Sequence, residues 1–171
     1  MSLHAITVLG RDRPGIIAET TAALAGLGLN LEDSSMTLLR GQFAMTLVTA
    51  GEAPAGAIEA ALEPLTADGA LAVSVREAAA GHAPPAAATY LLSVHGGDRP
   101  GIVSAVTAEV ARVGGNITDL TTRLAGDLYV LTAECSFPPE TDLAALGSAI
   151  QQVAERLGVG ATLREVESDE L

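Results

Sequence analysis

Lysine is absent from this chain of 171 residues, and cysteine occurs only once. Arginine supplies all nine basic side chains against 21 acidic residues, which gives a formal net charge of −12. Because duplex DNA is held mainly through neutralised phosphates, an evenly acidic chain without a basic patch disfavours direct DNA binding. The lone Cys135 excludes a disulfide within the chain and fits a reducing compartment.

Long apolar runs are also missing, since no stretch approaches the roughly 20 residues of a membrane-spanning helix. Residues 1–4 lead directly into a strand pattern, so we expect no signal peptide and a cytoplasmic protein. Aromatic residues are scarce, with two Phe, two Tyr and no Trp. A core must therefore be built from Ala, Leu, Val and Ile.

An internal repeat dominates what the sequence does contain. A shift of 86 residues lays residues 12–16, Asp-Arg-Pro-Gly-Ile, over the same five letters at 98–102. Fifteen of the 44 positions from 6 to 49 are identical after this ungapped shift, which indicates a duplicated unit. We therefore expect two domains, at residues 1–77 and 88–167. A linker rich in Ala and Pro is expected between them at 78–87, and an acidic tail at 168–171.

The first copy alternates between strand and helix patterns. Residues 3–9 alternate as a strand, and residues 14–27 place Ile17, Leu24 and Leu27 at helical spacing, with Thr20 in the fourth place. Gly28 stands where this helix should end. The remaining expected elements are a hairpin of 30–39 and 42–50 around Arg40-Gly41, a helix over 58–65 and a strand over 71–77.

The second copy repeats this order. Its first helix has the apolar stripe Val103, Val106, Val110 and Val113, and its hairpin turns at Gly126-Asp127. A second helix over 143–157 and a closing strand over 161–166 follow. The order β-α-β-β-α-β predicts an α+β fold, with two ferredoxin-like domains whose helices cover one face of an antiparallel sheet.

The loop at 12–16 is open to two interpretations. Local physics explains it with Asp12 as an N-cap reaching the Gly15 N–H, Pro14 in the first helical turn and Gly15 allowing close approach. A helix N-terminus also offers free N–H groups and a positive dipole end, which suit a carboxylate. A bound amino acid could then set its ammonium group against Asp12.

The loop, followed by Gly-x-Asn-Leu/Ile-x-Asp at 28–33 and 114–119, resembles the ACT domain family of amino-acid-sensing modules. Residues 28–36 with 39–43 are most similar to the glycine cleavage system repressor branch of tandem ACT proteins. The resemblance covers nearly the whole chain. It implies that ACT domains pair side by side through their second strands, with ligand sites at the seam.

Such pairing, if antiparallel, brings the loop of one copy beside the start of the second strand of the other. It implies one site made of Arg11, Asp12, Gly15 and Ile16 with Asn116 and Ile117. It implies a second site made of Gly97, Asp98, Gly101 and Ile102 with Asn30 and Leu31. A linker of about ten residues spans at most roughly 33 Å, which allows pairing within one chain, and pairing between chains also stays open. Because the loops begin differently, as Leu-Gly-Arg and His-Gly-Gly, the two sites need not bind alike.

The function that the resemblance implies is an amino-acid-binding regulatory protein for glycine or a similar ligand. It would control transcription of amino-acid metabolism through a protein partner such as a DNA-binding regulator, as a homo-oligomer, with no cofactor, metal, membrane or direct nucleic-acid contact. Alternatives are a regulatory subunit of a biosynthetic enzyme and a pairing module without ligand. ACT modules also precede phosphoserine phosphatase and formyltetrahydrofolate deformylase domains, but no P-loop, nucleophile elbow or dinucleotide fingerprint occurs here, so we expect no enzyme.

Four further residues have two interpretations each. His95 could donate to a ligand or be an ordinary strand-end residue. Arg13 and Arg99 could hold a neighbouring carboxylate or the ligand. Cys135 is expected to pack in a strand as a small apolar residue rather than to react.

Overall fold

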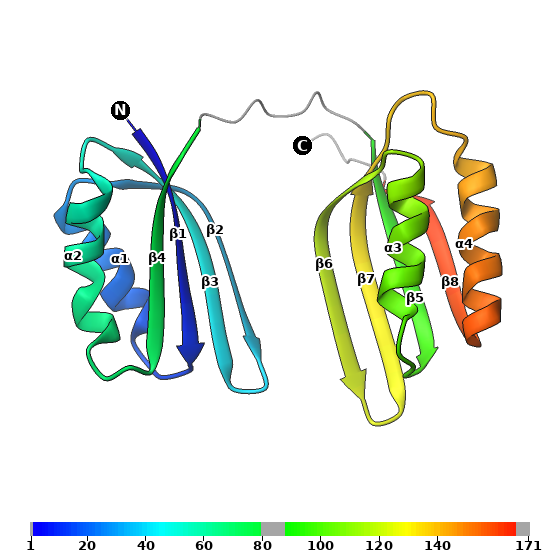
Figure 1. The fold of residues 1–171 in the computed structure, drawn as a ribbon, viewed down its shortest axis with the longest axis horizontal. Helices are drawn as coiled ribbons and strands as arrows, with labels where there is room; N and C mark the ends of the chain where they lie inside the picture. Colours follow the sequence, from blue (N-terminus) through cyan, green and yellow to red (C-terminus); the bar gives the residue numbers. More distant parts are fainter. Residues whose placement is uncertain (1, 80–87, 167–171) are drawn as a thin grey trace. The chain divides into compact units, whose positions relative to one another are not determined.

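The chain divides into two compact units, residues 1–83 and 84–171, which we call domain 1 and domain 2. The computed structural model describes residues 2–79 and 88–166. Most of the expected linker, 78–87, and all of the expected tail, 168–171, lie outside these residues. Each domain has its own four-stranded sheet with two helices on one face (Figure 1).

Domain 1 follows the expected β-α-β-β-α-β order. Its elements are β1 (Ser2–Arg11), α1 (Ile16–Gly26), β2 (Asn30–Leu39), β3 (Gln42–Gly51), α2 (Ala55–Thr66) and β4 (Leu71–Ala78). The strand order is β2-β3-β1-β4, and every neighbouring pair is antiparallel. The strands β2 and β4 are therefore the two edges of the sheet.

Domain 2 repeats this arrangement. Its elements are β5 (Thr89–Gly97), α3 (Ile102–Arg112), β6 (Asn116–Ala125), β7 (Leu128–Ser136), α4 (Leu143–Leu157) and β8 (Val159–Glu165). The strand order is β6-β7-β5-β8, so β6 and β8 form the edges. The expected α+β fold of two ferredoxin-like units is confirmed, and both hairpin turns fall at the expected residues.

The edge strand β2 runs parallel to β1, because each is antiparallel to β3 between them. Asn30 pairs with Ala50, and Ala50 also pairs with Leu3 at the start of β1. Asn30 therefore lies at the end of domain 1 opposite to the turn that follows β1. The predicted seam site depends on this separation.

The buried stripe of α1 consists of Ile16, Thr20 and Leu24. The prediction that Ile17 faces the core is wrong, since Ile17 is 44% exposed. The helix begins at Ile16, so its buried positions recur every four residues from Ile16 rather than from Ile17. The Thr20 hydroxyl donates to the Ile16 carbonyl at 2.7 Å and is thereby satisfied inside the core.

The core of domain 2 contains the only cysteine. The buried residues of α3 are Ile102, Val106 and Val110. The expected stripe began at Val103 and included Val113, but Ile102 is buried in place of Val103, and Val113 is not among the buried residues. Cys135 on β7 is fully buried, and this burial raises the pKa of its thiol. The expected role of Cys135 as a small apolar packing residue is confirmed.

No helix among residues 2–79 and 88–166 is long and apolar enough to cross a membrane.

Candidate functional site

The turn that joins β1 to α1 is fixed by two backbone hydrogen bonds. The Arg11 N–H donates to the Ala70 carbonyl at 3.0 Å, and the Asp12 N–H donates to the Gly41 carbonyl at 3.1 Å. These bonds tie the turn to the α2–β4 loop and to the β2–β3 hairpin. The turn is therefore a fixed part of one end of domain 1.

The helix cap differs from the one expected from the sequence. Gly15, not Asp12, is the N-cap of α1, and no side chain caps it. Gly15 has φ of 92°, a left-handed conformation that favours glycine, so backbone conformation is the reason for glycine here. Pro14 consequently lies before the helix rather than in its first turn. The expected Asp12 cap and the expected place of Pro14 are corrected accordingly.

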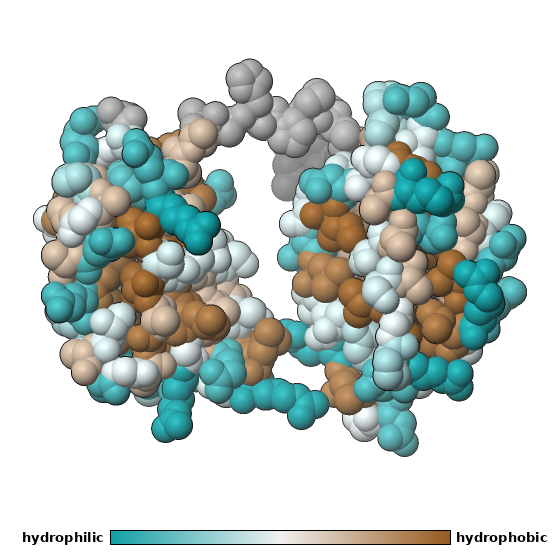
Figure 2. Space-filling model, in the orientation of Figure 1, coloured by the Kyte–Doolittle hydropathy of each residue, from teal (hydrophilic) through white to brown (hydrophobic). Residues whose placement is uncertain are grey.

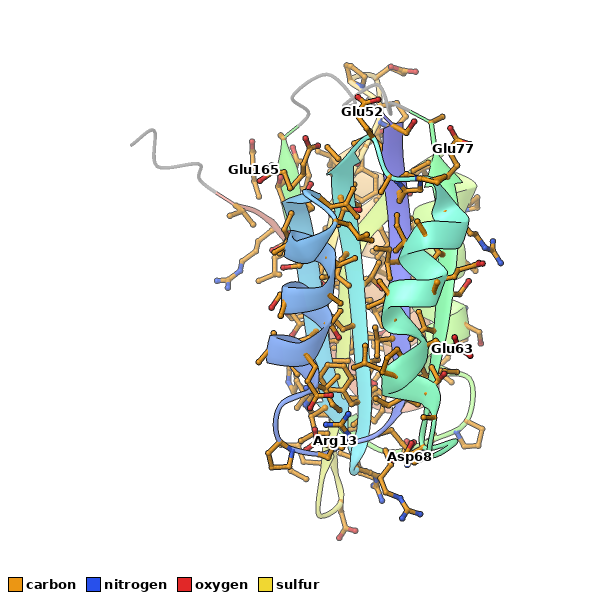
Figure 3. All side chains as sticks on the ribbon, turned by 90° about the vertical axis from the view of Figure 1, so that its left-hand side faces the viewer. Arg13, Glu52, Glu63, Asp68, Glu77 and Glu165 are labelled. Carbon is orange, nitrogen blue, oxygen red and sulfur yellow. The ribbon has the colours of Figure 1, made fainter. Side chains whose placement is uncertain are left out.

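Arg13 makes an ion pair with Glu19 in the first turn of α1. Its two terminal nitrogens donate to the two carboxylate oxygens at 2.8 and 2.7 Å. The hydrogen bond from Arg13 lowers the pKa of the Glu19 carboxyl, and the same bond raises the pKa of Arg13. In Figure 3, Arg13 lies at the same end of domain 1 as Asp68. Arg13 was expected to hold either a neighbouring carboxylate or the ligand, and this ion pair favours the neighbouring carboxylate.

A groove of about 430 Å³ opens beside this turn. Its volume falls within the roughly 300–1,000 Å³ of ligand pockets in proteins. Three expected site residues border it, together with Arg13, for which contact with a ligand was one of two interpretations. Sequence reasoning missed the other four lining residues. The full lining is Asp12, Arg13, Gly15, Ile16, Ile17, Ala18, Met36 and Phe43.

The hairpin register explains why Met36 and Phe43 reach the groove. The turn at Arg40-Gly41 pairs Leu38 with Phe43 and Met36 with Met45. The last residues of β2 therefore return to the end of the sheet where β1 enters the turn. The predicted hairpin was a signal that could have identified Met36 and Phe43.

The turn that joins β5 to α3 has the same backbone but different side chains. Gly101 is again a left-handed N-cap without a side-chain cap, with φ of 95°. The counterpart of Glu19 is Ala105, and the first turn of α3 has no acidic residue. The Arg99 guanidinium lies against Gly158, the left-handed C-cap of α4. There its positive charge suits the carbonyl end of that helix.

His95 lies near the end of β5 and faces the neighbouring strand β8. Its ring stands 2.8 Å from the position that a Cβ of Gly160 would occupy on the neighbouring strand β8. The side chain is exposed on the sheet and covers Gly160. This contact favours the interpretation of His95 as an ordinary strand residue.

The expected site residues fall into two groups in each domain. Arg11, Asp12, Gly15 and Ile16 gather at the turn of domain 1, and Gly97, Asp98, Gly101 and Ile102 gather at the turn of domain 2. Asn30 and Leu31 begin β2, and Asn116 and Ile117 begin β6. Each domain thus carries its two groups of predicted site residues at opposite ends of its sheet, and their pairing across a seam stays a prediction.

Both second strands are open edges. Leu31, Met36 and Leu38 of β2 are between 41% and 49% exposed, and Leu120 and Leu124 of β6 are 40% and 42% exposed. Figure 2 shows apolar side chains reaching the surface of both units. Both strands also carry a bulge at the same place, after Leu31 and after Ile117. The repeat thus preserves the bulge of this edge strand.

Two buried polar side chains face each other at the far end of domain 1. His4 on β1 and Thr49 on β3 are register partners, exposed by 2% and 0%. His4 Nδ1 and Thr49 Oγ1 have no hydrogen-bond partner among the described residues. The same shift of 86 residues places Tyr90 and Cys135 at these positions in domain 2, where they pair in the same way.

Replacing Thr49 with Val should stabilise domain 1. The change removes a buried hydroxyl without a partner and keeps the side-chain shape, so we expect unfolding to cost about 1 kcal/mol more. Urea denaturation followed by far-UV circular dichroism measures this difference. Thr46→Val on the same strand, where the side chain is exposed, is the control and should change stability by less than about 0.5 kcal/mol. A destabilised Thr49→Val variant would contradict the unpaired state of this hydroxyl.

Two other grooves contain none of the expected site residues. One of about 430 Å³ lies along α2 and β4 and is lined by Glu59, Glu63 and Val73 among others. Another of about 270 Å³ lies in domain 2 beside Pro138 and Asp142. Within the described parts of the chain, no three His, Cys, Asp or Glu residues gather as a metal site.

Comparison with known proteins supplies the family context of these turns. The family model described as ACT domain matches residues 4–76 and 88–164. The glycine cleavage system transcriptional repressor of Escherichia coli is 31% identical over 119 residues, which is 69% of this chain and 63% of that protein. This chain thus matches somewhat less than two thirds of the repressor's length.

Two solved structures match almost the whole chain. A crystal structure of an unknown protein from Galdieria sulphuraria has a TM-score of 0.82 at 35% identity, over 97% of this chain and 99% of that one. A crystal structure of a putative glycine cleavage system transcriptional repressor has a TM-score of 0.68 at 19% identity, with 98% of each chain covered. The second likeness concerns the fold alone.

Proposed function

Because the chain belongs to the ACT domain family across both of its repeats, we propose that it is an amino-acid-binding regulatory protein. Its ligand is glycine or a similar small amino acid, and its two binding modules are residues 1–77 and 88–167. Its output is the control of transcription of glycine or other amino-acid metabolism. The relationship to a glycine cleavage system transcriptional repressor supports this output.

The observation that carries the proposal is the groove at the Gly15 turn. Its wall includes the start of α1, where the first backbone N–H groups have no partner within the helix. Such a helix end attracts a carboxylate, and the exposed Asp12 offers a partner for an ammonium group. A small zwitterion carries both of these groups.

The open edges support a seam that completes each site. An antiparallel pairing of β2 with β6 sets Asn116 and Ile117 beside the Gly15 turn, and sets Asn30 and Leu31 beside the Gly101 turn. The exposed leucines of both edges favour such pairing, since it covers apolar surface and satisfies unpaired backbone groups. The partner edge belongs to the other domain or to a second copy of the chain.

Regulation requires that the ligand bind one assembly state better than another. An amino acid held by both sides of a seam stabilises the paired state, and the paired state is the one that a protein partner distinguishes. That partner is a DNA-binding regulator, because a net charge of −12 without lysine disfavours direct contact of this chain with phosphates.

A thermal-shift screen with the twenty common amino acids tests the proposal. An amino acid at a hundred times its Kd should add about 2.7 kcal/mol to the stability of the folded state. Gly101→Val should abolish the shift, because the new side chain projects from the turn. The control is Gly147→Val in the first half of α4, where a Cβ meets nothing within 4 Å.

A flat screen with the intact chain would contradict amino-acid binding. A shift that survives in Gly101→Val and in the corresponding Gly15→Val would place the site elsewhere. Co-purification of a biosynthetic enzyme, rather than a DNA-binding protein, with the tagged chain would favour the regulatory-subunit alternative.

A further inference from the structure

The groove beside the Gly15 turn has an apolar wall. It runs from the first turn of α1 to the β2–β3 hairpin, and its apolar members are Ile16, Ile17, Ala18, Met36 and Phe43. Ile17 and Met36 are each 44% exposed, so much of this wall faces solvent. Within a hollow of about 430 Å³, this is apolar surface that a ligand can cover.

The charged lining residues stand together at the turn. Arg13 is paired with the Glu19 carboxylate at 2.7 Å, which leaves Asp12 as the one charged lining residue without an ion pair to another described residue. The groove thus offers an unpaired carboxylate and a helix start at one end, and apolar side chains along the rest. An amino acid with an apolar side chain matches this division.

The corresponding positions of domain 2 are more polar. The shift of 86 residues sets Ser104, Thr122 and Tyr129 where domain 1 has Ala18, Met36 and Phe43. Each of these three differences adds a hydroxyl group, and the Ser104 hydroxyl donates to the Gly101 carbonyl at 3.0 Å. The fully apolar wall is therefore a property of domain 1 and not of the repeat.

We infer that the groove beside the Gly15 turn selects a small amino acid with an apolar side chain, such as L-valine, over glycine. This inference rests on the proposed function and narrows its ligand. Each methylene group moved from water onto an apolar wall tightens binding about fourfold. L-Valine brings three more carbon atoms than glycine, and their partial coverage in an open groove should give a preference of about tenfold. Glycine leaves the wall uncovered.

A titration of the full chain with L-valine, L-threonine and glycine tests this selection. L-Threonine has the shape of L-valine with a hydroxyl in place of one methyl group, so the pair separates apolar character from size. The methionines of the chain, Met1, Met36 and Met45, all belong to domain 1, so nuclear magnetic resonance of ¹³C-labelled methionine methyl groups reports on domain 1 alone. The signal that is lost in Met36→Leu identifies Met36. We expect this signal to shift with a Kd about tenfold lower for L-valine than for L-threonine or glycine.

Met36→Thr gives domain 1 the residue of domain 2 at this position. In calorimetric titrations, this variant should lose severalfold of the preference for L-valine over glycine, because the apolar wall becomes shorter. Leu39→Thr is the matched control, since Leu39 is 48% exposed on the same strand but does not line the groove. Its preference should stay unchanged. The ratio of the two Kd values cancels any effect of a variant on the turn that both ligands share.

The outcomes separate the inference from the function beneath it. Equal Kd values for L-valine and glycine, equal values for L-valine and L-threonine, or an unchanged preference in Met36→Thr would overturn the inference and leave amino-acid binding in place. Binding detected by calorimetry without a shift of the Met36 signal would overturn it as well. Absence of binding by all twenty common amino acids would overturn the proposed function, and the inference with it.

Discussion

Gly10→Ala should destabilise domain 1 by about 3 kcal/mol or more. Gly10, the residue before the last of β1, has φ of 155°, and a Cβ there would stand 2.1 Å from the Ala70 carbonyl oxygen and 2.9 Å from Leu71 Cα. Both obstacles are backbone atoms, so no side-chain rotation relieves the contact. A small domain of this size has little stability to spare.

Two spectroscopic signals separate the domains in this experiment. Both tyrosines, Tyr90 and Tyr129, lie in domain 2, and tryptophan is absent, so tyrosine fluorescence reports on domain 2 alone. Far-UV circular dichroism reports on both domains. In urea, Gly10→Ala should split the circular dichroism transition and leave the tyrosine midpoint in place.

The control for Gly10→Ala is Gly56→Ala in α2, where a Cβ meets nothing within 4 Å. This variant should be more stable by roughly 0.5–1 kcal/mol, because alanine is the better helix former. A tyrosine transition that moves as far as the circular dichroism transition in Gly10→Ala would contradict independent unfolding of the two units.

Leu146→Ala should cost domain 2 about 3 kcal/mol and expose its only thiol. Leu146 on α4 is 1% exposed and belongs to the same buried cluster as Cys135. Truncating a buried leucine removes its burial and leaves a cavity. Because burial raises the pKa of the Cys135 thiol, the folded protein should resist alkylation. The loss of about 3 kcal/mol should then speed labelling roughly a hundredfold, if opening of the domain limits access.

The measurement is the rate at which a chromophoric thiol reagent modifies Cys135 in the absence of denaturant. Leu128→Ala is the matched control, since Leu128 is in the same domain but 49% exposed. Its labelling rate should stay within a fewfold of the natural protein. Equal acceleration in both variants, or rapid labelling of the natural protein, would contradict the buried state of this thiol.

The sequence predicted the fold because the repeat presents every pattern twice. The hairpin at Arg40-Gly41 and its counterpart at Gly126-Asp127 were placed correctly, since two strand patterns flank a turn signal in each copy. The first helix was less well placed. Two apolar residues, Ile16 and Ile17, begin it, and only the left-handed cap at Gly15 decides which of them turns inward.

The site was only partly predictable. The motif identified the turn, but the pairing of Arg13 with Glu19 spans six residues between a loop and a helix, which no helical spacing rule covers. His4 and Thr49 are 45 residues apart, and only the register of β1 with β3 brings them together. The proposed seam would depend on contacts between domains or chains, which lie beyond what local patterns encode.

The open edges of β2 and β6 affect how readily the protein aggregates. Unpaired strand edges with exposed leucines are templates on which further strands can add, and such addition ends in aggregates. At neutral pH a charge of −12 keeps copies of the chain apart. This repulsion fades toward the isoelectric point near 4.4. Mildly acidic buffers therefore remove the main barrier to precipitation of this protein.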